Sequence, residues 1–500
     1  MLNEIKIPAL LSGVGKVFGL CAGVYIAYSL GPENFAFYAL WILTIEYLAY
    51  FNLGMGPAIF RNISMSENIN DTAQSQQTID LGITILLMSA LIGFLLLFLG
   101  HLNQLLPIQM SNLEFCLLLI SRIVDIWFGF TKSISKGFGL MVPQAWIEGS
   151  LAVVVPLLNV AAVAFLGILG LMIAHILASL IGIMIFRFHK IYLTFSLYFD
   201  YPAIKKLLKI SLPLFSANLL EATMITLPIM LSGYVIEGLA LGGFLYVFQN
   251  SKPEKIPLYS YFTNISFRSL LIEASNNSKF GETDKWESID LTLKSYFMLT
   301  AIGTTCMFVA LNYLSRFFLQ EYVGSLPLLL ITLPCLSFFA LRRIFNAYFT
   351  AVNKLTKRLA IYLICLLLSL CFFGYAEPLG VIDVKVLALW ISSLMLFSST
   401  LGFVAFLKDV GQTSQYIWKQ LISISSSLLV SYFCMKVLLD YSEWFVLDTL
   451  QGATLFAIVS LLCVPFYALL LLCITALFSN QRPDFYLKRL VSSEIFTNKD

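Results

Sequence analysis

The chain has 500 residues, of which 59% are hydrophobic and only 12% are charged, and its formal net charge is +3. A soluble globular protein is about one quarter charged, so this composition excludes an ordinary soluble domain and is typical of a protein that crosses a membrane many times. The nine cysteines and three histidines show neither paired spacing nor metal-site spacing, so we predict no disulfide framework and no metal centre.

Apolar runs of about 20 residues recur along the whole chain, and each is long enough to cross roughly 30 Å of hydrocarbon as a helix. The runs are apolar on all sides, so they lack the alternation of outer-membrane strands. We therefore predict an all-α integral membrane protein with about fourteen transmembrane helices. The predicted spans are 8–29, 36–58, 79–100, 112–132, 146–166, 168–187, 211–232, 239–263, 290–312, 325–347, 358–376, 384–406, 418–438 and 452–478.

The lysines and arginines of the loops fix the predicted orientation. If the N-terminus is cytoplasmic, nearly all of them fall on the cytoplasmic side, and only Arg316, Lys385 and Lys436 fall on the far side. Such a bias is the positive-inside rule, and it predicts that both termini are cytoplasmic.

A weak internal repeat indicates two lobes. Residues 7–12 and 212–216 open spans one and seven with similar sequences, and the stretch from Gly31 to Arg61 has the same spacing as that from Gly238 to Arg268. Both copies start on the same side, so we predict two six-helix lobes related by a pseudo-twofold axis along the membrane normal, with the substrate site between them.

The repeat also sets the predicted domain boundaries. We expect an N-lobe at 1–190, an amphipathic linker at 191–210, a C-lobe at 211–410, and spans thirteen and fourteen with a cytoplasmic tail at 411–500. Within the linker, Tyr201 to Lys209 combines apolar and basic residues and is expected to lie as a helix at the membrane surface.

Charged side chains inside the predicted spans are the main functional signal, because a charge at the bilayer centre costs at least a few kcal/mol and normally faces a cavity or a partner. We predict a substrate-binding group of basic residues and a group of acids for coupling or ion pairing. The basic group is Lys16, Arg122, Lys252, Lys255, Arg342 and Arg343, and the acidic group is Glu46, Asp125, Glu221 and Glu254.

Structural roles compete with these functional ones. Arg122 and Asp125 lie three residues apart, so they share a helix face and can neutralise each other. Arg342 and Arg343 can extend to the cytoplasmic headgroups. His175, in span six, is more typical of a packing residue than of a proton relay.

The basic group predicts an anionic substrate. Lys252 and Lys255 share a helix face, and Lys16 adds a third ammonium if the two lobes face each other. Such a cavity suits a diphosphate that crosses the membrane. Tyrosines and amides in spans two and eight, among them Tyr47 and Asn250, suit sugars.

The sequence resembles a known superfamily at residues 29–40, 51–56, 60–61 and 206–215. These stretches are similar to the polysaccharide-flippase branch of the multidrug/oligosaccharidyl-lipid/polysaccharide exporter superfamily, and most of all to its Wzx-type O-antigen or capsule flippases. The specific matches are confined to spans one, two and seven, and Ala36 stands where the family usually has glycine.

The resemblance implies that the chain moves undecaprenyl-diphosphate-linked oligosaccharide repeat units across the bacterial inner membrane by alternating access. Membrane lipids and a polysaccharide polymerase are the other implied partners, and nucleic acid is not one. Two relatives in the same superfamily are the alternatives: a cation or drug antiporter, and a lipid II flippase. A coupling proton or sodium ion is left open.

An enzyme is not expected. The longest loops, 59–78, 188–210 and 264–289, hold no cluster of acids and histidines and no glycine-rich phosphate loop. No ATP-hydrolysis motif occurs in the chain, so energy does not come from a nucleotide site within it.

Overall fold

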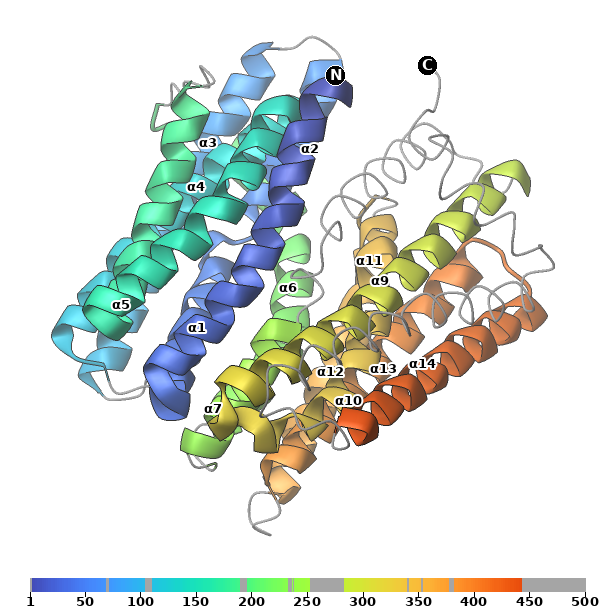
Figure 1. Cartoon of the computed structure of the whole chain (residues 1–500). Helices are drawn as coiled ribbons and strands as arrows, with labels where there is room; N and C mark the ends of the chain where they lie inside the picture. Colours follow the sequence, from blue (N-terminus) through green and yellow to red (C-terminus); the bar gives the residue numbers. More distant parts are fainter. Residues whose placement is uncertain are drawn as a thin grey trace. The chain divides into compact units, whose positions relative to one another are not determined.

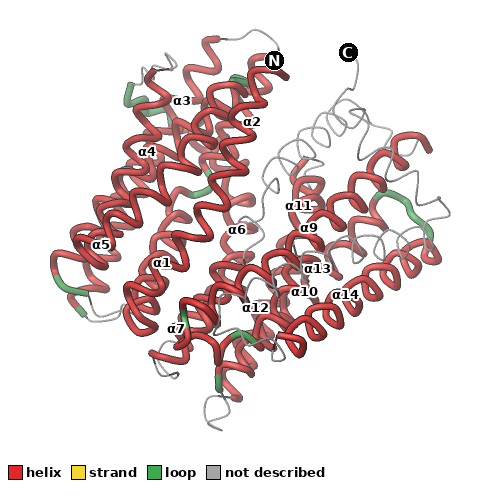
Figure 2. Tube along the Cα trace, in the orientation of Figure 1, coloured by secondary structure: helices red, strands yellow, loops and turns green. Residues whose placement is uncertain are grey.

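The computed structural model describes residues 2–68, 72–103, 110–188, 196–232, 236, 238–251, 283–339, 341–351, 354–376 and 382–442. These residues are almost all helical, and no strand occurs among them (Figures 1 and 2). The elements are α1 (Leu2–Leu48), η1 (Ala49–Asn52), α2 (Met55–Asn68), α3 (Thr72–Leu102), α4 (Asn112–Gly137), α5 (Met141–Phe188), α6 (Tyr201–Ser232), α7 (Gly238–Ser251), α9 (Thr283–Phe318), η3 (Gln320–Ser325), α10 (Pro327–Phe339), α11 (Arg342–Ala351), α12 (Leu355–Ala376), α13 (Val384–Asp409) and α14 (Ser414–Ser442).

Seven of the described helices are long and apolar enough to cross a membrane, which confirms the predicted all-α membrane fold. Of the seven, α5 contains the predicted spans 146–166 and 168–187, and α1 contains the span 8–29 and the first part of the span 36–58. The predicted fourteenth span, 452–478, and most of the second half of the eighth lie outside the described residues.

The double helices α1 and α5 each bend at one glycine. Gly31 has φ 69° and Gly167 has φ 58°, and both angles lie in the region that favours glycine because it has no Cβ. At the second bend the chain folds back closely: a Cβ on Gly170 would lie 2.1 Å from the carbonyl oxygen of Ala162. One glycine therefore replaces a whole loop between two spans.

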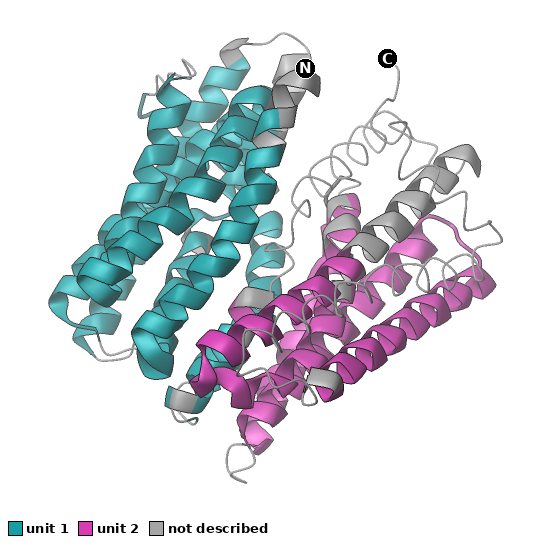
Figure 3. Ribbon diagram, viewed as in Figure 1, with its two compact units in different colours: residues 1–246 teal, residues 247–500 magenta. Residues whose placement is uncertain are grey.

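The chain divides into two compact units, residues 1–246 and residues 247–500 (Figure 3). Unit 1 holds α1 to α6 and the first part of α7, and unit 2 holds the helices that follow. The predicted lobe boundary after residue 210 stays a prediction. The expected surface helix at 201–209 is continuous with the seventh span, because α6 runs unbroken from Tyr201 to Ser232.

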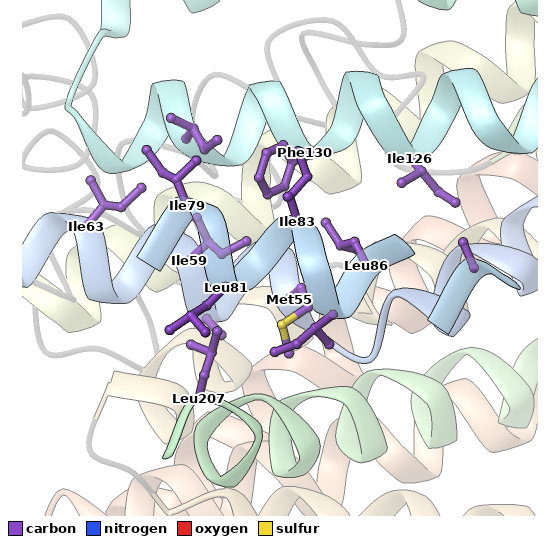
Figure 4. Close-up of a cluster of buried hydrophobic side chains, with 14 residues drawn as sticks. Met55, Ile59, Ile63, Ile79, Leu81, Ile83, Leu86, Ile126, Phe130 and Leu207 are labelled. Carbon is purple, nitrogen blue, oxygen red and sulfur yellow. The ribbon is translucent and has the colours of Figure 1, made fainter. Parts of the chain in front are cut away.

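Unit 1 has an apolar core where α2, α3 and α4 meet the start of α6 (Figure 4). Met55, Ile59 and Ile63 lie one helical turn apart on α2, so they form one buried stripe. The stripe packs against Phe130 of α4 and Leu207 of α6. This packing joins the beginning of α6 to the helices of unit 1.

The part of α1 before its bend at Gly31 packs very closely against the part of α5 before its bend at Gly167. Gly15 makes this possible, since a Cβ there would lie 2.5 Å from the backbone carbonyl of Ala152. One turn further on, Gly19 meets Pro156. Close approach at small residues is the usual way in which membrane helices gain packing contacts.

Replacing Gly15 by alanine is therefore expected to destabilise the protein by about 1–3 kcal/mol, because the added methyl group meets backbone that cannot move aside. The matched control is Gly13→Ala on the same helix, where nothing lies within 4 Å of the new Cβ. Apparent melting temperatures in detergent provide the measurement. Equal melting of the two variants would contradict the close crossing.

Candidate functional site

Three of the predicted site residues, Lys252, Glu254 and Lys255, lie outside the described residues. The others are distributed over helices of both units. Lys16 and Glu46 lie on α1, Arg122 and Asp125 on α4, Glu221 on α6, and Arg342 and Arg343 on α11.

Asp125 of α4 lies in unit 1 and is hydrogen-bonded to two side chains of α5. The His175 ring nitrogen Nε2 lies 2.9 Å from one carboxylate oxygen, and the Ser179 hydroxyl donates to the other at 2.6 Å. The carboxylate side chain is 17% exposed. Because His175 and Ser179 are four residues apart, they share one face of α5 and reach the same carboxylate.

The other side of this group is aromatic. The ring of Trp41, which is fully buried on α1, meets the His175 ring edge to face, with 6.0 Å between the ring centroids. Tyr38 stacks on Trp41 one turn away, at 6.4 Å. A carboxylate, an imidazole and a hydroxyl thus lie together between α4 and α5, with Trp41 of α1 against the imidazole.

Arg122, one turn before Asp125, has a different partner. Its Nη2 donates to Oδ1 of Asn52 at 2.7 Å, and the residue is only 4% exposed. Arg122 and Asp125 interact electrostatically, as their spacing predicts, but each makes its hydrogen bonds to another element. Arg122 bonds to η1, and Asp125 bonds to α5.

Asn52 marks a break in the predicted second span. The helix α1 ends at Leu48, a short 3-10 turn follows, and Leu53 and Gly54 both have positive φ before α2 begins. The break is covered by protein, since Gly54 lies against the backbone of Ser211 on α6. Irregular backbone inside a membrane protein is tolerated where it is buried in this way.

Glu46 and Glu221 lie on neighbouring stretches of α1 and α6. Tyr47, which follows Glu46, shares a hydrogen bond with Thr223, two residues beyond Glu221. Glu46 is exposed and Glu221 is partly buried. Lys16 is partly buried beside the Gly15 crossing. The structure thus places Glu46 and Glu221 near the contact between α1 and α6. Lys16 lies in the other part of α1, before the bend at Gly31.

In unit 2, Arg342 lies over the ring of Phe339, with 3.7 Å from its guanidinium carbon to the ring centroid. Such a cation–π contact gives the charge a fixed partner in the protein. Arg343 follows it at the start of α11.

A second polar cluster joins α11, α12 and α13. Asp409, whose side chain is 6% exposed, accepts hydrogen bonds from Lys354 at 2.8 Å and from Lys357, and Tyr348 donates to it at 3.0 Å. Burial and the adjacent carboxylate raise the pKa of Tyr348 above its ordinary range, so the phenol stays protonated and acts as a donor. The sequence analysis did not connect these residues.

Some buried donors of unit 1 have no protein partner. Among the described residues they are Nε1 of Trp41, Nε of Arg122 and the hydroxyls of Ser121 and Ser135, each at least nine-tenths buried. Buried polar groups normally have partners, and a cluster that lacks them often marks a functional or hydrated region. Within the described residues, no three His, Cys, Asp or Glu side chains come together as a metal ion would need.

Sequence reasoning selected Arg122 and Asp125 but missed Asn52, His175 and Ser179 as their partners. A signal was present for two of these, since a histidine and a serine four residues apart in one span form a polar face. For Asn52 the signal was hidden, because the break lies inside a run that is apolar enough for one continuous span.

No family model and no curated protein matches the chain. Solved structures do match in fold. One is described as the lipid II flippase MurJ in an inward closed conformation, with a TM-score of 0.64 and 15% identity over 95% of this chain and 98% of that chain. Another is an inward-facing multidrug resistance MATE family transporter of the MOP superfamily, with a TM-score of 0.60 and 12% identity over 80% of this chain and 98% of that chain. A third is a MATE in the bent conformation, with a TM-score of 0.54 and 14% identity over 82% of this chain and 94% of that chain.

Proposed function

We propose that the chain is a flippase that moves undecaprenyl-diphosphate-linked oligosaccharide repeat units, of O-antigen or capsule, across the bacterial inner membrane. These matches establish the fold of the chain. The observation that carries the proposal is the extent of the likeness: the structure of a lipid II flippase matches 95% of the chain, against about 80% for the multidrug transporters. A flippase for a lipid-linked substrate therefore accounts for more of this chain.

The charges support an anionic substrate. Lys16 is the one charged residue of the predicted first span, and Lys252 and Lys255 are expected in the middle of the eighth. A cation exporter would favour acids at such positions. In the proposed cycle the basic residues take the diphosphate headgroup from the inner leaflet while the lipid tail stays in the bilayer. The lobes then change orientation and release the headgroup outward.

The coupling site is proposed to be Asp125 with His175 and Ser179. This group is partly buried and its hydrogen bonds join α4 to α5, so a proton bound here is proposed to act on the contact between the two helices. It shares no residue with the lysines proposed for the diphosphate, so the proton and the substrate are proposed to bind different side chains.

Neutralising the three lysines together, as Lys16→Gln, Lys252→Gln and Lys255→Gln, is expected to reduce export by at least about ten-fold, because a diphosphate would lose its charged partners. The variant is expressed in a strain that lacks its own repeat-unit flippase. Surface polysaccharide and lipid-linked oligosaccharide held at the inner leaflet are both measured. A matched control neutralises three lysines that are exposed elsewhere, Lys385, Lys408 and Lys436.

Export at the wild-type level by the triple variant, at normal protein abundance, would refute the cationic site. The same strains separate the flippase alternatives. Rescue of lipid II export instead of surface polysaccharide would assign the chain to the lipid II substrate, and drug resistance without either would assign it to efflux.

A further inference from the structure

Residues 196–200, which lie directly before α6, are held against α3 by hydrogen bonds. Residues 196–200 form no helix. The backbone N–H of Ser196 donates to Asp80 at 2.8 Å, and its hydroxyl donates to the other oxygen of the same carboxylate at 3.0 Å. Two residues on, the N–H of Tyr198 donates to the Thr84 hydroxyl at 3.2 Å. The segment therefore has a fixed position along α3.

Asp80 lies where the sequence of α3 changes from polar to apolar. The helix is polar from Thr72 to Thr78 and strongly apolar after Asp80. Asp80 and Thr84 are one turn apart, and the same side of the helix continues into large exposed side chains, beginning with Leu87 and Leu91. Exposed apolar side chains on a membrane-spanning helix face lipid, so the segment lies where the lipid-facing surface begins.

The segment turns its own large apolar side chains away from α3. Leu197 is 69% exposed, Phe199 is 71% exposed, and Tyr201, the first residue of α6, is 76% exposed. In an extended chain, alternate residues point to the same side, so these three side chains are expected to form one strip, while the Ser196 and Tyr198 N–H groups face α3. The Tyr198 side chain between them is less exposed, at 40%. Three such neighbours are unfavourable in water but normal at a bilayer interface.

Basic residues follow the apolar strip directly. Lys205, Lys206 and Lys209 are exposed on the first turns of α6, while Leu207 between them is buried in the core of unit 1. The helix therefore presents its lysines outward. Within residues 196–209 the only acid is Asp200, so the surface carries a net positive charge.

We propose that residues 196–209 are a surface site for anionic phospholipid in the cytoplasmic leaflet. Leu197, Phe199 and Tyr201 enter the boundary between headgroups and acyl chains, and the three lysines bind lipid phosphates. The Asp80 carboxylate fixes how deeply these three side chains enter the bilayer, because it holds Ser196 at the point where the apolar part of α3 begins. This site is separate from the one proposed for the transported substrate, and it binds bilayer lipid that is not exported.

The first experiment measures depth. Nitroxide labels are attached to cysteines placed singly at 197, 198, 199, 200 and 201 in the full chain, with the nine native cysteines replaced, and the protein is reconstituted in lipid nanodiscs. Labels at 197, 199 and 201 are expected to collide more with oxygen, which concentrates in lipid, and labels at 198 and 200 less. Asp80→Asn is expected to remove the alternation. Labels at 197, 199 and 201 that collide mainly with a water-soluble nickel complex would overturn the proposal.

The second experiment measures the anionic preference by native mass spectrometry, with phosphatidylglycerol or phosphatidylcholine titrated onto the purified protein. Each of Lys205→Gln, Lys206→Gln and Lys209→Gln is expected to weaken phosphatidylglycerol binding about five-fold. Phosphatidylcholine binding is expected to stay unchanged. The matched control neutralises Lys385, Lys419 and Lys436. Wild-type phosphatidylglycerol binding by the triple variant at 205, 206 and 209 would also overturn the proposal.

Discussion

Replacing Asp125 by asparagine is expected to reduce the proposed export about ten- to hundred-fold while the protein still reaches the membrane in normal amounts. Asparagine has nearly the same shape and can still accept the Ser179 hydroxyl, so the packing of α4 on α5 is kept. It carries no charge, so the hydrogen bond to the His175 ring loses its ionised acceptor. A hydrogen bond to a charged group contributes about 1.5–3 kcal/mol, so the expected loss of export is about ten- to hundred-fold.

Two controls separate coupling from folding. Ser179→Ala removes one hydrogen bond but leaves the carboxylate and the imidazole, and it is expected to export within a few-fold of wild type. Asp440→Asn removes a carboxylate from an exposed pair with Lys436 and is expected to have no effect. Proton flux into proteoliposomes, with lipid-linked oligosaccharide on one side, gives the direct readout. Full flux with Asp125→Asn would reject this coupling site and leave the flippase proposal standing.

Replacing Arg122 by glutamine is expected to lower the stability of the protein, and this is the second large effect. Arg122 is almost fully buried and bonds to Asn52 at the break between η1 and α2. Glutamine is too short to keep that bond from α4, so the Asn52 oxygen loses its charged donor. We expect the free energy of unfolding to fall by about 2–3 kcal/mol. Arg187→Gln, on the exposed end of α5, is the matched control.

A double-mutant cycle tests the pair itself. If Arg122 and Asn52 act together, the effects of Arg122→Gln and Asn52→Ala are not additive, and the coupling is expected to be about 1–2 kcal/mol. The apparent melting temperatures of the four proteins in detergent are sufficient. Strictly additive losses would show that Arg122 stabilises the protein through contacts other than Asn52.

The helices could be predicted from the sequence because hydropathy is a local property. The third predicted span, 79–100, lies within α3, and the predicted external turn at Gly31 coincides with the bend in α1. The break at Asn52 could not be found in the same way, because Leu48 to Gly56 is as apolar as an intact span. Its conformation depends on Arg122 and on α6, which are distant in the sequence.

The site was only partly predictable for a similar reason. The cost of a buried charge identifies Asp125 and Arg122 from the sequence, and their spacing predicts the electrostatic interaction between them but not their hydrogen-bond partners. Their actual partners lie 50 and 70 residues away, on α5 and η1. Which of several polar neighbours a buried charge selects is decided by tertiary packing, and a single sequence contains no direct signal for it.

The single-glycine bends at Gly31 and Gly167 have a consequence for how the protein is made. An ordinary loop lets one span leave the insertion machinery and wait in the lipid until the next has been synthesised. Here the two spans on either side of each bend are joined without slack, so neither can settle before the other. Spans one and two, and likewise spans five and six, must therefore enter the bilayer as hairpins, each committed to its orientation as a pair.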